Sequence, residues 1–175
     1  MRRVAVLVLA CVVPCCGGGQ SSATSQVGGI TLTSDAFTDG GSIPARYTCD
    51  GAGTAPRLHW SGVPARAAEL VLTMRDPDAP GGAFIHWLLY GIDPTSSGLV
   101  EGAVPAGARQ GRSSAGNDGY TPPCPPAGSR HHYVFTLSAL SSSSGLAAGA
   151  ASGDVDAAVT SKVIASGVLT GLYGR

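Results

Sequence analysis

The sequence predicts a mainly β domain, built on an antiparallel sheet, with one helix near its end. Short apolar runs are separated by clusters of proline and glycine, as expected of strands joined by turns. Strands and helices do not alternate regularly, which argues against a doubly wound parallel sheet. With 175 residues, the chain is long enough for one ordinary domain and too short for two comfortable ones.

Strand signals recur along the body of the chain. Ile30 and Leu32 alternate with two threonines, which is the period-two pattern of a half-buried strand. The later signals are short apolar runs that stop at a turn residue or open the next loop. The expected strands therefore cover residues 30–33, 70–74, 84–90, 133–140 and 168–173.

Residues 154–165 carry the only helical pattern in this part of the sequence. Three valines recur every four residues from Val155 to Val163, as on one face of a helix. Asp154 can cap the first turn, and Gly167 can stop the helix. The sequence therefore predicts a helix over 154–165.

Residues 1–16 have the pattern of an export signal. Arg2 and Arg3 precede an apolar run over 4–13 that is too short to span a membrane. Small, mostly polar residues then form a stretch typical of a flexible tether over 17–27. A cysteine after a short signal core resembles a bacterial lipoprotein signal, in which the new N-terminal cysteine is acylated. We therefore expect an exported lipoprotein of the bacterial cell envelope, anchored to the membrane through Cys11, Cys15 or Cys16.

Two cysteines remain in the expected domain, which covers residues 28–175. They are Cys49 and Cys124, and export would place them in an oxidising compartment. The residues alone leave two interpretations open, a disulfide or two separate buried thiols.

Charge and missing motifs argue against several classes of function. Eleven Lys and Arg residues balance eleven Asp and Glu residues, so no strong positive field would attract nucleic acid. The sequence lacks the nucleophile elbow, the His-Glu-x-x-His motif, the phosphate-binding loop and a paired Cys-x-x-Cys frame. These absences weigh against hydrolases and nucleotide enzymes, and we expect no cofactor, no bound metal and no nucleic-acid partner.

The turn after the strand over 70–74 carries two carboxylates. Asp76 and Asp78 belong to the segment Asp-Pro-Asp-Ala-Pro, whose two prolines stiffen the turn. Solvated acids at the end of a strand are the plain interpretation of this segment. A pair of positioned acids at a binding site is the functional one.

Histidines lie on two of the expected strands. Alternation places His86 on one strand face with Phe84 and Leu88. His131 and Tyr133 share one face of the next long strand in the same way. Each histidine taken alone is more typical of a satisfied core residue than of a ligand.

Together and in this order, the motifs resemble the phosphatidylethanolamine-binding protein family, in particular its bacterial, Raf-kinase-inhibitor-like branch. The resemblance covers residues 29–175 and depends on five motifs in register, at 47–51, 76–80, 86–87, 119–126 and 131–135. It implies a central antiparallel sheet packed with a smaller sheet, and peripheral helices including one near the C-terminus. It also implies a small pocket that accepts anions such as phosphate or a phospholipid headgroup.

The resemblance also implies which residues bind the ligand. The expected set is Asp76, Asp78, His86, Tyr120, Pro125, Pro126, His131 and Tyr133. His132 stands where the family usually has arginine, and Pro122 and Pro123 replace glycine or another small residue, so the pocket mouth differs. Because the resemblance places the loops of Cys49 and Cys124 toward the pocket end, we predict a disulfide between them.

The predicted function is an exported, non-enzymatic binding protein, with a small anionic ligand and the membrane as its partners. An imidazole can donate to a phosphate oxygen while a carboxylate holds its second nitrogen. The alternative is an inhibitor or regulator of a kinase or protease that acts by surface contact, with no protein target identified by the sequence. A metal-dependent hydrolase is a third class, with these residues as its ligands: Asp76, Asp78, His86 and His131.

Overall fold

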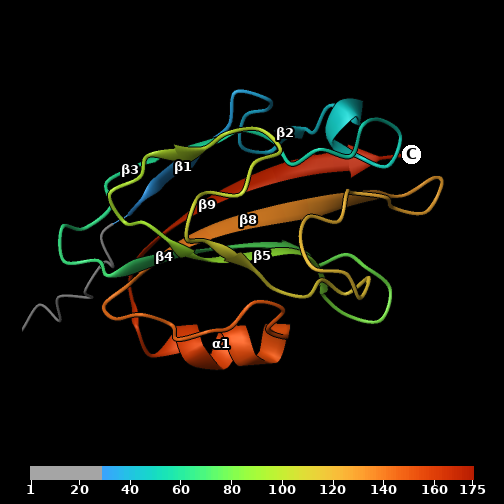
Figure 1. Cartoon of the computed structure of the whole chain (residues 1–175). Coiled ribbons are helices and arrows are strands. Elements are labelled where there is room, and N and C mark those ends of the chain that lie inside the picture. Colours follow the sequence, from blue (N-terminus) through green and yellow to red (C-terminus); the bar gives the residue numbers. More distant parts are fainter. Residues whose placement is uncertain (1–28) are drawn as a thin grey trace, which may run out of the picture.

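The computed structural model describes residues 29–175 and arranges them as two β-sheets with two short helices (Figure 1). The expected signal segment over 1–16, the tether over 17–27 and the three candidate cysteines for lipidation lie outside the described residues. Within the described range, no helix is long and apolar enough to cross a bilayer. In chain order the elements are β1 (Thr31–Thr33), β2 (Gly41–Ser42), η1 (Ala45–Tyr47), β3 (Leu58–Ser61), β4 (Glu69–Asp76), β5 (Phe84–Ile92), β6 (Gly98–Leu99), β7 (Arg109–Gln110), β8 (Arg130–Leu140), α1 (Ser152–Thr160) and β9 (Val163–Gly174).

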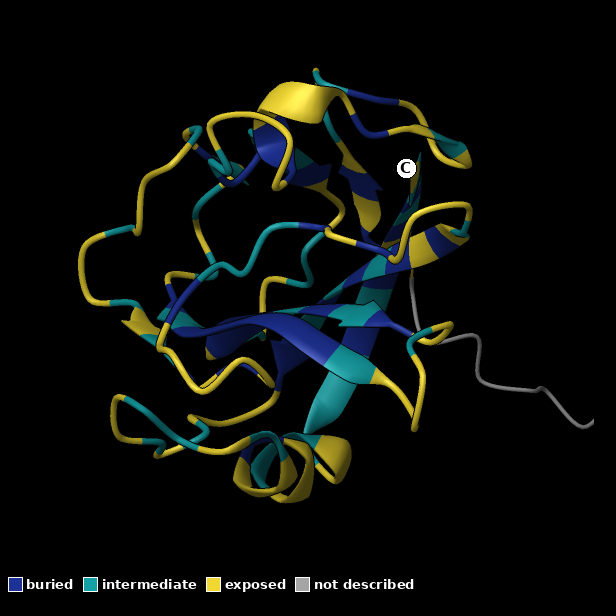
Figure 2. Ribbon diagram, turned by 90° about the vertical axis from the view of Figure 1, so that its right-hand side faces the viewer, coloured by how far each residue is buried: buried dark blue, intermediate teal, exposed yellow. Residues whose placement is uncertain are grey.

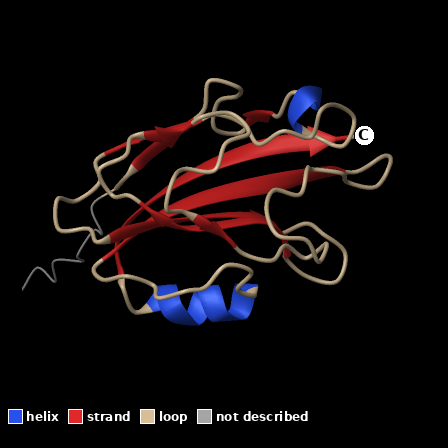
Figure 3. Cartoon of the chain, in the orientation of Figure 1, coloured by secondary structure: helices blue, strands red, loops and turns tan. Residues whose placement is uncertain are grey.

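The larger sheet has six strands in the order β2-β9-β8-β4-β5-β7, and the smaller sheet has three in the order β1-β3-β6. Paired strands run antiparallel, except that β2 and β9 are parallel. The smaller sheet and α1 lie on opposite sides of the larger sheet (Figures 1 and 3). The predicted fold class, a central antiparallel sheet with a smaller sheet and a helix near the C-terminus, is confirmed.

All five expected strands are present, as β1, β4, β5, β8 and β9. The last four extend beyond their apolar runs, because ladder pairing continues into polar residues such as Arg75. The sequence did not predict β2, β3, β6 and β7, which are two to four residues long. Such short strands carry little periodic signal and are formed by their partners.

The core lies between the two sheets and continues on the other side under α1. Inward residues of β4 and β8 fill the first layer: Leu70, Leu72, Met74, Tyr133, Phe135 and Leu137. A second cluster lies between the larger sheet and α1 and contains Val71, Ile85, Leu88, Tyr90, Leu140 and, from α1 itself, Val155. Each fully buried aliphatic side chain contributes about 1.5–3 kcal/mol to stability. Figure 2 shows these central strands buried, while the outer surface of α1 and the loop tips are exposed.

A β-bulge in β5 changes which side chains face the core. Arg75 pairs with Ile85, but the preceding Met74 pairs with Trp87, so His86 is an extra residue opposite β4. Beyond the bulge the alternation changes phase, and Leu88 joins the cluster under α1. The prediction that His86 and Leu88 share a face is therefore wrong.

The predicted helix is present, but its bounds differ from 154–165. It covers Ser152–Thr160, Asp154 lies inside its first turn without capping it, and β9 already begins at Val163. Gly167 does not end the helix, because it lies within β9 and pairs with β8. The valine spacing is compatible with a helix throughout, but pairing with β8 determines the structure after residue 162.

Candidate functional site

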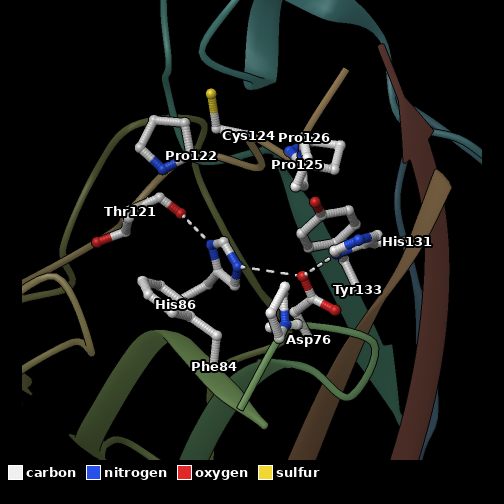
Figure 4. A pocket seen from close by; sticks show the side chains of 12 residues that line it. Asp76, Phe84, His86, Thr121, Pro122, Cys124, Pro125, Pro126, His131 and Tyr133 are labelled. Carbon is white, nitrogen blue, oxygen red and sulfur yellow. Dashed lines mark hydrogen bonds and ion pairs between the residues drawn. The ribbon is translucent and has the colours of Figure 1, made fainter. Parts of the chain in front are cut away.

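A cavity of about 270 Å³ opens at one end of three neighbouring inner strands of the larger sheet, β4, β5 and β8 (Figure 4). Because β4 runs antiparallel to β5 and β8, its end at Asp76 lies beside the starts of the other two strands. The loops that follow β4 and precede β8 complete the walls. The lining residues are Asp76, Ala79, Pro80, Phe84, His86, Thr121, Pro122, Cys124, Pro125, Pro126, His131 and Tyr133.

Asp76 is the buried carboxylate of this cavity and is only 3% exposed. Its Oδ1 accepts the backbone N–H of Asp78 at 2.8 Å, which fixes the turn after β4. Its Oδ2 accepts the Nδ1–H of His131 at 2.7 Å and lies 4.0 Å from Nε2 of His86. One oxygen of Asp76 therefore faces both imidazoles.

His86 is held from the opposite side of the cavity. Its Nδ1–H donates to the carbonyl of Thr121 at 2.8 Å. A carbonyl can only accept, so the proton of the neutral ring is on Nδ1 and Nε2 is left as an acceptor. Burial lowers the pKa of His86 below its ordinary value, an effect that the Thr121 carbonyl and the Asp76 charge oppose.

The ring of His131 is also fixed through Nδ1, but by a side-chain carboxylate instead of a backbone carbonyl. It is 6% exposed, and its Nδ1–H donates to the Asp76 carboxylate. Its Nε2 makes no hydrogen bond to any residue in the described part of the chain. Both imidazoles thus have one nitrogen fixed by the protein and a second nitrogen available.

Tyr133 contributes a hydroxyl group to the cavity. Its hydroxyl is buried and has no hydrogen-bond partner among residues 29–175. The ring packs edge-on against His86, with centroids 5.1 Å apart. Burial and the Asp76 charge raise the pKa of Tyr133, so the hydroxyl keeps its proton and can donate.

The remaining walls are mostly apolar and rigid. Pro80, Phe84 and the prolines of the segment 122–126 line the cavity, and prolines offer no backbone donor. Cys124 of this segment is joined to Cys49 by a disulfide, with their Cα atoms 5.4 Å apart. The polar side chains of the cavity lining are therefore those of Asp76, His86, Thr121, His131 and Tyr133.

Two of the eight expected ligand-binding residues do not line the cavity. The carboxylate of Asp78 accepts the backbone N–H and the ring Nδ1–H of His132, both at 2.7 Å, and these bonds lower the pKa of Asp78. Tyr120 donates to the carbonyl of Tyr47 at 2.8 Å and packs edge-on against Trp87. Both residues therefore support the walls of the cavity rather than face into it.

Thr121 is the lining residue whose role the sequence could not indicate. It acts through its carbonyl, and every residue type has a carbonyl, so no side-chain pattern marks it. Within residues 29–175, no three His, Cys, Asp or Glu side chains are arranged to hold a metal ion. The metal-ligand set considered for a hydrolase is therefore not assembled, since Asp78 turns to His132.

Comparison with known proteins places the chain among close relatives. The family model described as phosphatidylethanolamine-binding protein matches residues 33–174. The UPF0098 protein of Methanothermobacter thermautotrophicus is 44% identical over 151 residues, which cover 83% of this chain and 99% of that protein. A crystal structure of a candidate homologue of phosphatidylethanolamine-binding protein from Chlamydia trachomatis superposes with a TM-score of 0.80 at 39% identity. That match covers 85% of this chain and 99% of the other.

A further relative has a name that describes it as a lipoprotein. The candidate lipoprotein LppC of Mycobacterium tuberculosis is 50% identical over 109 residues, which cover 62% of this chain. The match spans about half of LppC, 54% of its length.

Proposed function

This chain belongs to the phosphatidylethanolamine-binding protein family, and from that premise we propose that its cavity binds a small phosphate-bearing anion without catalysing a reaction. The observation that carries the proposal is the arrangement around Asp76. Two imidazoles, each with Nδ1 already held, lie beside a buried Tyr133 hydroxyl without a partner. A phosphate oxygen offers an acceptor to the Tyr133 hydroxyl and to the Nε2–H of a protonated imidazole.

The charges in the cavity link binding to proton uptake. While the His86 ring is neutral, its Nε2 is an acceptor and offers nothing to an anion beside the Asp76 carboxylate. Protonation of His86 adds a positive charge to the cavity and turns Nε2 into a donor. Affinity for an anion is therefore expected to fall as the pH rises, and the low pKa of His86 extends this dependence below pH 6.5.

The absence of an activated nucleophile supports binding rather than turnover. The Asp76–His131 pair has the form of an oriented base, but of the two lining hydroxyls that of Thr121 is bonded to Ser113 and that of Tyr133 has a raised pKa. A phenol that resists ionisation is a better hydrogen-bond donor than nucleophile.

We propose in addition that the protein is an exported lipoprotein, a placement that the similarity to LppC and the pattern of residues 1–16 support.

Calorimetric titration with glycerophosphoethanolamine tests the proposal, because the charge of a phosphodiester does not change between about pH 5 and about pH 8. We expect tight binding at the acid end and a loss of at least about tenfold at the alkaline end, as the His86 imidazole deprotonates. His86→Ala and His131→Ala should abolish binding. His59→Ala is the matched control, since His59 lies on β3 and pairs with Asp35 away from the cavity.

Two outcomes would contradict the proposal. Unchanged affinity in both cavity variants would show that the ligand does not bind in this cavity, provided that thermal unfolding shows the variants folded. Release of phosphate from monoesters by the wild-type protein, lost in His131→Ala, would establish catalysis instead. Inorganic phosphate titrated at about pH 5.5 separates recognition of free phosphate from recognition of the whole headgroup.

A further inference from the structure

The wall of the cavity opposite Asp76 is a proline-rich segment, residues 121–126, which we call the proline strap. Four of its six residues are prolines and lack a backbone N–H, so the strap can form few hydrogen bonds to the body of the protein. Thr121 N–H donates to the carbonyl of His86 at 2.8 Å, and the carbonyl of Pro123 accepts the N–H of Cys49 at 3.0 Å. The disulfide from Cys124 to Cys49 is the covalent attachment in the middle of the strap.

This disulfide is open to solvent. Cys49 and Cys124 are both exposed residues, whereas Pro123 and Pro125 on either side of Cys124 are buried. An exposed disulfide can be approached by an external thiol, and exposed disulfides are the more easily exchanged ones. Cys124 also lines the cavity, so the same residue connects the solvent-accessible bond with the binding site.

A guanidinium lies beside one of the two sulfurs. Nη1 of Arg175 is 3.5 Å from Sγ of Cys124, and Nε of Arg175 is 3.3 Å from Oδ2 of Asp50. The backbone of Arg175 is tied to the loop after the strap, since its carbonyl accepts the N–H of Gly128 at 2.7 Å. A cation in this position stabilises a thiolate on Cys124 and makes that sulfur the better leaving group.

We propose that the Cys49–Cys124 disulfide is a thiol–disulfide exchange site that sets the position of the proline strap. A thiolate of a dithiol partner attacks Sγ of Cys49, the S–S bond breaks, and its electron pair leaves on Cys124 as a thiolate beside Arg175. The second thiolate of the partner then attacks the mixed disulfide and releases the Cys49 thiolate. The partner dithiol is oxidised to a disulfide by two electrons, and the Cys49–Cys124 pair is reduced by the same two.

Reduction changes the cavity because the strap supplies several of its walls. Pro122, Pro125 and Pro126 all lie within two residues of Cys124 and line the site. Once the bond is open, the strap keeps its hydrogen bonds at Thr121 and Pro123 but loses its covalent attachment. A less preorganised wall lowers affinity for the ligand. This last consequence rests on the proposed anion-binding function, whereas the exchange chemistry does not.

The exchange chemistry is tested without any ligand. Reduction of the purified protein by dithiothreitol is followed by thiol titration, and brief exposure to glutathione followed by mass spectrometry locates the adduct. We expect the adduct on Cys49 and a reduction rate lower by about threefold in Arg175→Gln. Arg66→Gln is the matched control, an exposed arginine before β4 at the end of the strand away from Asp76, and should leave the rate unchanged. An adduct only on Cys124, or equal rates in all three proteins, overturns the assignment.

The effect on the cavity is tested by calorimetry with glycerophosphoethanolamine at about pH 5.5. We expect the reduced protein and the Cys49→Ser/Cys124→Ser double variant to bind about tenfold more weakly than the oxidised protein, with an unchanged far-UV circular dichroism spectrum. Equal affinity of the oxidised and reduced forms, or loss of the folded spectrum on reduction, overturns control of the pocket by the disulfide. Failure of the oxidised protein to bind would instead refute the proposed function and leave the exchange chemistry standing on the thiol measurements.

Discussion

At the scale of single residues, the cavity contains one buried carboxylate that orients the groups around it. Asp76 fixes its own turn with Oδ1 and the His131 ring with Oδ2. His86 is fixed from the other side by a backbone carbonyl. Because both rings have their Nδ1 occupied, they present the same atom, Nε2, to a ligand, and Tyr133 adds a third group that lacks a partner.

The hydroxyl of Tyr133 provides a direct test of this arrangement. Tyr133→Phe removes the donor and keeps the ring, so we expect affinity for glycerophosphoethanolamine to fall by about tenfold, the value of one hydrogen bond to a charged group. Stability should stay level or rise, because a buried hydroxyl without a partner costs about 1–3 kcal/mol. Calorimetry and urea denaturation measure the two quantities.

Tyr120→Phe is the control for that variant. It removes the bond from the Tyr120 hydroxyl to the carbonyl of Tyr47, so the free energy of unfolding should fall by about 1 kcal/mol. Affinity should be retained, since Tyr120 does not line the cavity. The reverse result, in which Tyr120→Phe loses affinity and Tyr133→Phe does not, would show that Tyr120 and not Tyr133 contacts the ligand.

At the scale of elements, a buried carboxylate at the start of β4 attaches the loop after β8 to the sheet. Glu69 is 5% exposed, and Oε1 accepts the N–H of Gly91 at 3.0 Å and the hydroxyl of Ser144 at 2.6 Å. Oε2 accepts the hydroxyl of Ser143 at 3.0 Å and the N–H of Ser144 at 2.8 Å. Burial alone would raise the pKa of Glu69, but these bonds outweigh it and lower the pKa below 4.5.

A carboxylate with a lowered pKa stabilises the folded state at pH values above its ordinary pKa, and this contribution is lost as the pH falls through the folded pKa. Glu69→Ala should therefore lower the free energy of unfolding by about 2–3 kcal/mol at pH 7, because buried donors lose their acceptor. Urea denaturation at pH 7 and at about pH 3 measures the change, which should shrink at the lower pH. A difference independent of pH would show that Glu69 acts by packing and not by charge.

At the scale of the whole molecule, the described domain is a two-sheet body whose cavity lies at one edge, and residues 1–27 carry the pattern of an export signal and tether. A cavity for a phosphate-bearing headgroup and a lipid anchor would together hold the protein at a membrane surface. Lipidation adds membrane affinity in proportion to the buried acyl chain, and one chain alone holds only weakly.

Cell fractionation of the full chain tests the anchor. We expect the protein in the detergent phase, because an N-terminal cysteine with several acyl chains is stably held. Of the serine variants at Cys11, Cys15 and Cys16, one should move the protein to the aqueous phase and thereby identify the modified residue. A wild-type chain found wholly in the aqueous phase would contradict lipidation and leave export unaffected.

Local patterns in the sequence were sufficient for the parts of this protein that depend on local physics. The period-two alternation of residues 30–33, the apolar runs of the long strands and the valine spacing after Asp154 predicted element types that the structure contains. Alternation also placed His131 and Tyr133 on one strand face, where both line the cavity. These features follow from neighbouring residues along the chain, so the sequence expresses them directly.

Only the tertiary structure determined the features that depend on a partner far along the chain. The bulge that separates Leu88, under α1, from Phe84 and His86 on the cavity side arises from pairing with β4, which the periodicity of β5 cannot show. The end of α1 was determined by pairing of residues 163–165 with β8. Asp78 turned from the expected site to His132, because a bond to a backbone N–H and a ring N–H together satisfied its carboxylate. In each case a non-local contact outweighed a local preference, because register and hydrogen-bond partners are fixed only when distant segments meet.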